Sequence, residues 1–298
     1  MTNRPKTAAP ATSAAPSSPP ASPDDVKGWF PKIDQLLFTW FLERQARLGQ
    51  PGDLVELGSY LGKSAILIGR HVREGETFTV CDLFGSEAPD DSNQQEMIHS
   101  YSTLTREAFE RNYRAFHDRL PEIVQGPTSL ILDRVRPDSC RFVHVDASHL
   151  YEHVSGDIEA ARTMLSDEGV VVCDDYRSEH TPGVAAAVWE AVVTGGLRPI
   201  CVTPQKFYGT WGEVDAIRDD LLAWAEAKEN VWHGVQRVAG HRLVRVKGRW
   251  RAATKDDRVR KLERRLAGVR DELDSVRGSL SFKIGRGVTA LPRALRRR

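Results

Sequence analysis

The sequence predicts a doubly wound α/β fold with a mostly parallel, seven-stranded sheet, followed by a C-terminal coiled-coil helix. Three observations lead to this prediction. Short β-branched runs alternate with segments of helical period from about residue 53 to residue 211. Four of these runs stop at an acidic residue, which is typical of strands whose carboxyl ends border one ligand crevice. Beyond residue 252, apolar residues recur instead at alternating spacings of three and four.

The chain begins with a segment whose composition opposes folding. Residues 1–24 consist largely of Pro, Ala and Ser, which cannot bury enough apolar surface to offset chain entropy, so we expect a disordered leader. The next segment is predicted to be a helix that ends near Gly49, Pro51 and Gly52. Its apolar residues follow a helical period: Trp29, Phe30, Ile33, Leu36, Leu37, Trp40, Phe41 and Leu42.

The sheet and its helices are predicted in alternation. We expect strands at 53–57, 77–82, 122–125, 141–146 and 169–173, and helices at about 62–73, 104–118, 151–165 and 183–194. A pair of strands at 198–203 and 206–211 is predicted to close the sheet as an antiparallel edge. A helix at 213–230 and a short strand at 241–246 complete this domain, which we place at residues 25–250.

Residues 251–280 are predicted to form a coiled-coil helix. Its apolar positions are Val259, Leu262, Leu266, Val269, Leu273, Val276 and Leu280. Apolar residues at alternating spacings of three and four favour a homo-oligomer of parallel helices. The alternative is a single helix packed on its own domain.

The last segment, residues 281–298, is a basic amphipathic tail with six Lys or Arg and no acid. From residue 255 onward the chain has 14 Lys or Arg and 6 Asp or Glu, although the net charge of the whole chain is only +1. Such a tail can contact an anionic membrane surface or remain an ordinary solvated tail. No specific nucleic-acid partner is expected.

The composition also indicates the cellular compartment in which we expect the protein. The chain has no apolar run long enough to cross a bilayer, and its N-terminus lacks the apolar centre of a signal peptide. The four cysteines, Cys81, Cys140, Cys173 and Cys201, show no C-x-x-C spacing, which favours free thiols in a reducing compartment. We therefore expect a cytoplasmic protein, with peripheral contact at the inner membrane face if the tail binds lipid.

The loop Glu56–Ser64 after the first strand has several interpretations. As a Walker A loop it ends suitably in Gly-Lys-Ser, but Gly58 and Gly62 enclose three residues where a phosphate-binding loop needs four. It also lacks the G-x-G-x-x-G spacing of a dinucleotide loop. A tight turn without a ligand is a further alternative. The E-x-G-x-x-x-G pattern is that of class I methyltransferases, and Asp82 at the second strand end is then placed to bind ribose hydroxyls.

The segment from about Trp29 to Trp211 resembles a known family. It is similar to the metal-dependent O-methyltransferases that use S-adenosylmethionine and modify sugar hydroxyls of macrolide and aminocoumarin glycosides and of glycans. The resemblance lies in three stretches: Val55–Ser64, Val143–Tyr151 and Leu165–Tyr176. It implies a Rossmann-like methyltransferase fold. Ala147 and Glu168 stand where the family usually has glycine, and neither change removes a ligand.

The resemblance also implies roles for individual residues. By this resemblance, the methionine part of S-adenosylmethionine would be bound by Glu56, Gly58, Ser59, Tyr60 and Ser64, and the ribose by Asp82. The metal ligands correspond to Asp146, Asp174 and Asp175. His149 matches the base that takes the proton from the sugar hydroxyl.

These residue types suit methyl transfer to an alcohol. A sugar hydroxyl is too weakly acidic to ionise unaided near neutral pH. Three carboxylates favour Mg²⁺ or another oxygen-preferring divalent cation, which lowers the pKa of a bound hydroxyl and orients it. A histidine base can then remove the proton.

Each assignment has an alternative. His149 could be a structural histidine, or a zinc ligand paired with His153. Asp146 could cap the helix that follows it. The whole chain could be an NTPase with a P-loop-like turn, or a coiled-coil scaffold carrying an inactive methyltransferase domain. No sequence motif identifies the sugar-containing acceptor.

Overall fold

The computed structural model describes residues 19–86 and 104–250, together with Glu263, Leu266 and Arg270. The chain divides into two compact units, Met1–Gly248 and Arg249–Arg298, and every helix and strand named below lies in the first unit. The predicted coiled coil at 251–280, apart from those three residues, and the basic tail at 281–298 lie outside the described residues. So do residues 1–18 of the predicted leader. Its last residues enter a short 3₁₀ helix, η1 (Pro23–Asp25), capped by the Ser22 side chain.

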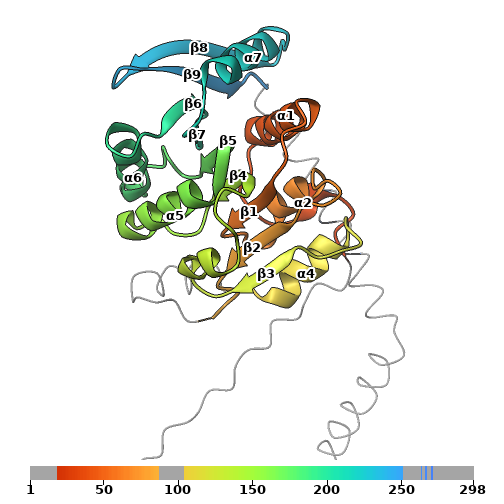
Figure 1. Ribbon diagram of the computed structural model, residues 1–298. Helices are drawn as coiled ribbons and strands as arrows, with labels where there is room; N and C mark the ends of the chain where they lie inside the picture. Colours follow the sequence, from red (N-terminus) through yellow and green to blue (C-terminus); the bar gives the residue numbers. More distant parts are fainter. Residues whose placement is uncertain (1–18, 87–103, 251–262, 264–265, 267–269, 271–298) are drawn as a thin grey trace, which may run out of the picture. The chain divides into compact units, whose positions relative to one another are not determined.

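Five neighbouring parallel strands form one side of the sheet (Figure 1). They are β1 (Asp53–Leu57), β2 (Phe78–Asp82), β3 (Glu122–Gln125), β4 (Cys140–Val145) and β5 (Leu165–Cys173). β1 pairs with β2 on one side and with β4 on the other, so the strand order reverses beside β1. Ligands of such sheets bind at this reversal, beyond the carboxyl ends of the strands.

The second half of the sheet is mostly antiparallel, with β6 and β9 parallel to each other, and it is larger than predicted. It contains β6 (Arg198–Val202), β7 (Phe207–Thr210), β8 (Val231–Val238) and β9 (His241–Gly248). Within the described residues the sheet therefore has nine strands in the order β3-β2-β1-β4-β5-β7-β6-β9-β8, which corrects the prediction of seven. β8 was not predicted, because it is a half-exposed edge strand with several polar residues and without a continuous apolar run.

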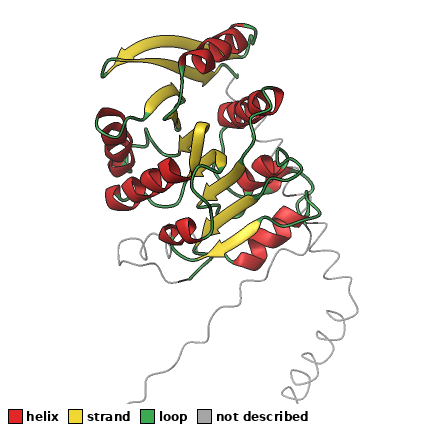
Figure 2. Ribbon diagram, in the orientation of Figure 1, coloured by secondary structure: helices red, strands yellow, loops and turns green. Residues whose placement is uncertain are grey.

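Helices cover both faces of the sheet (Figure 2). One face carries α1 (Lys32–Arg47), α2 (Lys63–Gly69) and α4 (Arg106–Arg114). The other face carries η2 (Thr128–Asp133), α5 (Tyr151–Met164) and α6 (Pro182–Val193), while α7 (Asp215–Glu226) lies beside the β8–β9 hairpin. The sheet is thus covered by helices on both faces, as predicted for a doubly wound fold. Most helices and strands begin and end within a few residues of their predicted positions.

Apolar packing fixes these layers. Phe38 of α1 packs edge-on against Phe142 of β4, with ring centroids 5.1 Å apart, and Phe41 stacks on Tyr208 of β7 at 5.3 Å. On the opposite face, valines of β4 and β5 pack against α5 and α6 in one buried cluster. Among the described residues, no helix combines the length and apolar composition that crossing a membrane requires.

Candidate active site

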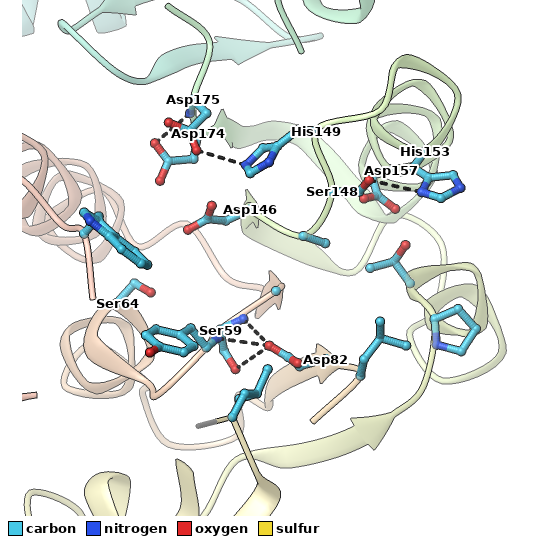
Figure 3. Close-up of a pocket in the computed structure, with 18 of the residues that line it drawn as sticks. Ser59, Ser64, Asp82, Asp146, Ser148, His149, His153, Asp157, Asp174 and Asp175 are labelled. Carbon is cyan, nitrogen blue, oxygen red and sulfur yellow. Dashed lines mark hydrogen bonds and ion pairs between the residues drawn. The ribbon is translucent and has the colours of Figure 1, made fainter. Parts of the chain in front are cut away.

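A cavity of about 820 Å³ opens beyond the carboxyl ends of the central strands (Figure 3). This volume is in the range of small-molecule sites. Residues from loops after β1, β2, β3, β4 and β5 line it, so the acidic strand ends converge as the sequence predicts. Of the predicted site residues, Gly58, Ser59, Tyr60, Ser64, Asp82, Asp146, His149, Asp174 and Asp175 line the cavity, whereas Glu56 does not.

Gly58 is required by a close approach between two loops. Its φ is 79°, and a Cβ atom there would lie 2.1 Å from the backbone oxygen of Asp146. Any other residue at this position would push the end of β1 away from the end of β4. The glycine therefore holds the floor of the cavity together, a reason that the sequence pattern did not reveal.

The Asp82 carboxylate organises the loop after β1. Its Oδ2 accepts hydrogen bonds from the backbone N–H groups of Ser59 (2.7 Å) and Tyr60 (3.0 Å), and its Oδ1 accepts one from the backbone of Phe84 (2.8 Å). Burial raises the pKa of Asp82, although these donors oppose the shift. Because each carboxylate oxygen can accept two bonds, Oδ1 retains capacity for a ligand hydroxyl.

Glu56 lies beneath the cavity floor instead of lining it. Its side chain is fully buried, and Oε1 lies 2.8 Å from Nδ1 of His144. Burial raises the pKa of Glu56 to about 8. The glutamate that the sequence assigns to the cofactor therefore contacts a histidine inside the sheet.

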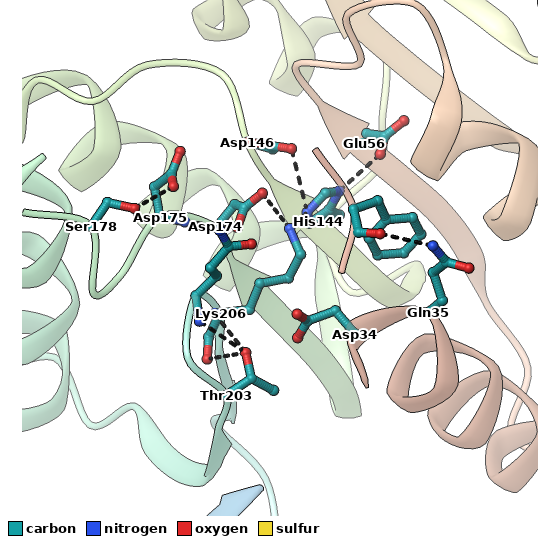
Figure 4. A network of polar contacts seen from close by, with 12 residues as sticks. Asp34, Gln35, Glu56, His144, Asp146, Asp174, Asp175, Ser178, Thr203 and Lys206 are labelled. Carbon is teal, nitrogen blue, oxygen red and sulfur yellow. Dashed lines mark hydrogen bonds and ion pairs between the residues drawn. The ribbon is translucent and has the colours of Figure 1, made fainter. Parts of the chain in front are cut away.

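Lys206, from the β6–β7 turn, reaches into the acidic cluster (Figure 4). Its side chain is fully buried, forms an ion pair with the Asp174 carboxylate and lies 3.1 Å from Nε2 of His144. Burial alone would lower the pKa of Lys206, but the charges of Asp174, Asp146 and Asp34 raise it to about 12. Since the ammonium group only donates, Nε2 of His144 is the acceptor and Nδ1 carries the ring proton.

The carboxylates of Asp146 and Asp174 lie together next to this lysine. Burial first, and then the charge of Asp174, raise the pKa of Asp146 well above its usual value. Among the described residues, the group whose ligand atoms lie within 4.8 Å of one another consists of His144, Asp146 and Asp174. This group differs from the predicted trio because Asp175 is replaced by His144. It does not include His149 or His153, so it gives the zinc-pair alternative no support.

Asp175 turns away from Asp146 and holds His149. Its Oδ2 lies 3.0 Å from Nε2 of His149, and its Oδ1 accepts a hydrogen bond from the Ser178 hydroxyl at 2.5 Å. Burial raises the pKa of Asp175, but these two contacts more than offset it and lower the pKa to about 2. Its φ of 51° is left-handed, which aims the two adjacent carboxylates in different directions.

Comparison with known proteins finds a similarity in the central part of the chain. Residues 55–176 match the family model described as a methyltransferase domain, Methyltransf_24. This stretch of the chain is therefore similar to a methyltransferase domain. No curated protein sequence matches the chain.

Solved structures resemble this part of the chain at low identity. The O-methyltransferase NovP is 23% identical, with a TM-score of 0.50, and the match covers 60% of this chain and 79% of NovP. Apo CalS11, a TDP-rhamnose 3′-O-methyltransferase of calicheamicin biosynthesis, is 18% identical, with a TM-score of 0.41 and coverage of 61% and 82%. Podospora anserina PaMTH1 with bound S-adenosylhomocysteine is 17% identical, with a TM-score of 0.42 and coverage of 62% and 83%. The NovP likeness establishes the fold.

Sequence reasoning missed three parts of the candidate site. Lys206 was counted only as the first residue of the predicted strand 206–211, and His144 was counted as part of an apolar strand. An imidazole inside an otherwise apolar run was the available signal for His144, because a buried polar group needs a partner. Trp29 was assigned to a helix stripe, but it precedes α1, lines the cavity and stacks on Tyr60 with ring centroids 5.8 Å apart.

Proposed function

We propose that this protein transfers the methyl group of S-adenosylmethionine to a hydroxyl of a sugar in a glycan, a glycolipid or a natural-product glycoside. The observation that carries the proposal is the convergence on one cavity of a cofactor-type loop, a carboxylate pair and a histidine–aspartate pair. The resemblance of three sequence stretches to sugar O-methyltransferases supports the acceptor class.

The donor would occupy the part of the cavity between β1 and β2. Gly58, Ser59, Tyr60 and Ser64 border the end that would take the methionine, and the remaining capacity of Asp82 Oδ1 suits a ribose hydroxyl. Acidic side chains also suit a donor that carries a sulfonium and an ammonium charge. The methyl group would then point toward the carboxylates after β4 and β5.

His149 is the proposed general base. An ionised carboxylate is an acceptor only, so Asp175, whose pKa is lowered to about 2, requires the ring proton of His149 to sit on Nε2. The other nitrogen, Nδ1, is then the atom that accepts the proton of the sugar hydroxyl. Asp175 also stabilises the imidazolium that forms, as the acid of a catalytic triad does.

Asp146 and Asp174 are the proposed holders of a divalent cation, with Asp175 adjacent. Two carboxylates at this distance and one lysine leave a net negative charge, and Asp146 ionises readily only if further positive charge is supplied. The donor set therefore fits a cation. When bound, Mg²⁺ or a similar ion would lower the pKa of the acceptor hydroxyl and orient it. Nε2 of His144 accepts from Lys206 and Nδ1 donates to Glu56, so this imidazole offers no lone pair to a metal while these contacts hold.

Isothermal titration with S-adenosylmethionine, S-adenosylhomocysteine and ATP tests the donor. We expect both sulfur compounds to bind and ATP not to bind, and tight binding of ATP alone would overturn the proposal. Mass spectrometry of candidate glycans incubated with enzyme and donor tests the acceptor. In the expected product a methyl group replaces the hydrogen of one sugar hydroxyl, so the mass rises by that of one CH₂ unit.

A further inference from the structure

The hairpin of β8 and β9 presents a basic surface that the proposed chemistry does not use. It extends the sheet at the edge opposite β3, and it lies outside residues 55–176, which match the family model described as a methyltransferase domain (Figure 1). The two strands are antiparallel, with Trp232 opposite Lys247 and Gly234 opposite Arg245. Side chains at such paired positions point to the same side of a sheet. These residues therefore share one face of the hairpin.

The opposite face of the hairpin is packed against α7. On that face the Arg242 guanidinium donates a hydrogen bond of 2.9 Å to the Asp219 carboxylate. The imidazole of His233 lies 4.0 Å from the carboxylate of Glu226. Both acidic residues belong to α7, so these two basic groups already have partners within the fold.

The face that carries Trp232 gathers two cations around an aromatic ring. The Lys247 ammonium lies 4.7 Å from the centroid of the indole, and the guanidinium carbon of Arg245 lies at 5.5 Å. Both basic residues are exposed, and within the part of the chain that the structure describes neither has a carboxylate partner. Gly234 leaves room for the indole along the strand, since a Cβ atom there would lie 3.0 Å from the ring. Cation–π attraction therefore holds two positive charges in place at the surface.

The distribution of charge along the chain favours the same region as a contact for anions. Residues 1–229 contain 22 Lys or Arg and 35 Asp or Glu, whereas residues 230–255 contain seven Lys or Arg and no acid. An extended anionic surface repels a body of this composition and attracts the basic segment that includes the hairpin. Charge alone would therefore orient the protein with the hairpin toward such a surface.

A lipid surface suits this face better than a nucleic acid does. Proteins hold single strands largely by stacking bases on aromatic rings, but the Trp232 ring already has two cations beside it. An indole flanked by basic groups is typical of the headgroup region of a bilayer, where Trp is enriched and Lys and Arg reach the phosphates. The chain also continues into residues 281–298, whose six Lys or Arg and absence of acid fit the same kind of surface.

We propose that the β8–β9 face formed by Trp232, Arg245 and Lys247 docks on an anionic phospholipid surface. The two cations bind lipid phosphates, and Trp232 is a positioning residue that keeps them in place and enters the headgroup layer. Docking of this kind depends on neither the donor nor the acceptor of the proposed function. Each basic residue close to an anionic bilayer adds to the attraction, so the pair contributes a measurable share of the affinity.

Flotation of the full-length protein with lipid vesicles tests the proposal. We expect binding to mixed vesicles of phosphatidylcholine and phosphatidylglycerol, and none to phosphatidylcholine alone. In the double variant Arg245→Gln/Lys247→Gln, the affinity for the mixed vesicles is expected to fall roughly 10- to 30-fold. The control Arg114→Gln/Arg119→Gln removes the same charge from exposed positions between α4 and β3, at the other edge of the sheet. This control is expected to bind like the unmodified protein.

Two substitutions of Trp232 test its positioning role. Trp232→Leu is expected to lose affinity several-fold, because the cations lose the ring that holds them. Trp232→Tyr keeps an aromatic ring and is expected to lose less. Circular dichroism checks that each variant is folded. Equal losses in both variants would show that the ring does not position the cations.

Several results would overturn the docking face. One is an unmodified protein that does not bind the mixed vesicles, and another is a folded Arg245→Gln/Lys247→Gln variant that binds them normally. In the latter case, loss of binding in Arg296→Gln/Arg297→Gln/Arg298→Gln would assign the contact to the tail. A loss of equal size in the control at the other edge would mean that only net charge matters. Tighter binding of a single-stranded oligonucleotide than of the vesicles, at the same ionic strength, would assign the face to nucleic acid.

Discussion

Lys206 and Asp174 form a buried ion pair at the carboxyl end of β5. The sequence predicts only acidic residues at this place. The lysine side chain is fully buried, and the aspartate side chain is 8% exposed. The ammonium group also touches His144 and lies near the faces of Phe30 and Phe38, at 5.6 and 5.8 Å from their ring centroids. The protein thus supplies one fixed positive charge to its own carboxylates.

Removing this charge is expected to make stability depend on metal. In Lys206→Met, the buried Asp174 loses its partner, which typically costs about 3–5 kcal/mol of unfolding free energy. We expect Mg²⁺ to restore more stability to this variant than it adds to the unmodified protein. Urea unfolding with Mg²⁺ and with EDTA measures both effects. The exposed Lys228→Met is the matched control, and unchanged stability of Lys206→Met in EDTA would contradict the prediction.

Asp174→Asn is expected to abolish most turnover while cofactor affinity persists. Loss of the cation site removes several kcal/mol of transition-state stabilisation, so we expect kcat to fall at least ~10²-fold. EDTA is expected to inactivate the unmodified enzyme to a similar level. Initial rates and titration with S-adenosylhomocysteine measure the two properties, with the exposed Asp133→Asn as control. If activity persists in EDTA, the proposed role of the divalent cation is wrong.

His149→Gln is expected to lower kcat by ~10²- to 10⁴-fold, the usual contribution of a general base. Cofactor affinity should stay unchanged, since His149 lies on the acceptor side. Asp175→Asn is expected to cause a smaller loss, because it weakens only the orientation of the imidazole. His241→Gln, far from the cavity at the start of β9, is the control. A normal kcat in His149→Gln would mean that another group takes the proton.

The pair of Glu76 and Arg141 is expected to make stability fall in acid. Two hydrogen bonds of 2.9 and 2.8 Å join them at the opposite ends of the strands. Burial raises the pKa of Glu76, but Arg141 and Arg73 lower it to about 2, below its ordinary value of 4.5. The folded state therefore favours the ionised form. This stabilisation is complete above pH 4.5 and is lost as the pH falls toward 2.

Glu76→Gln tests this pair. The variant leaves Arg141 without a counter-charge, and we expect a loss on the order of 3 kcal/mol at neutral pH. Its stability should change less than that of the unmodified protein between pH 4.5 and 2, so the two curves should converge in acid. Urea midpoints across this pH range measure the effect. Parallel curves would show that Glu76 titrates normally.

Deleting residues 255–298 is expected to lower the mass in solution without removing cofactor binding. The heptad pattern of 251–280 predicts self-association, and the described residues that line the cavity lie between Lys27 and Gln205. Light scattering and titration with S-adenosylhomocysteine measure the two properties. The double substitution Leu266→Asp and Leu273→Asp in the full chain is the matched control for the seam. An oligomer that persists in both variants would rule this prediction out.

The sequence by itself determined the central sheet and the place of the site. The runs ending near Glu56, Asp82, Asp146 and Asp174 are the ends of β1, β2, β4 and β5. These features are readable because alternating strands and helices force parallel strands, and parallel strands bring their carboxyl ends to one edge. The three stretches that resemble the O-methyltransferase family also contain the ends of β1, β4 and β5.

Only the tertiary structure decided how the acidic side chains are partnered. His144 and Lys206 are 62 positions apart, and their contact depends on β7 pairing antiparallel beside β5. The left-handed backbone at Asp175 turns its carboxylate away from that of Asp174, and Glu56 is fully buried beside His144. Pairings between distant segments leave no local period in a sequence, because they arise from packing and from the need of buried charges for partners.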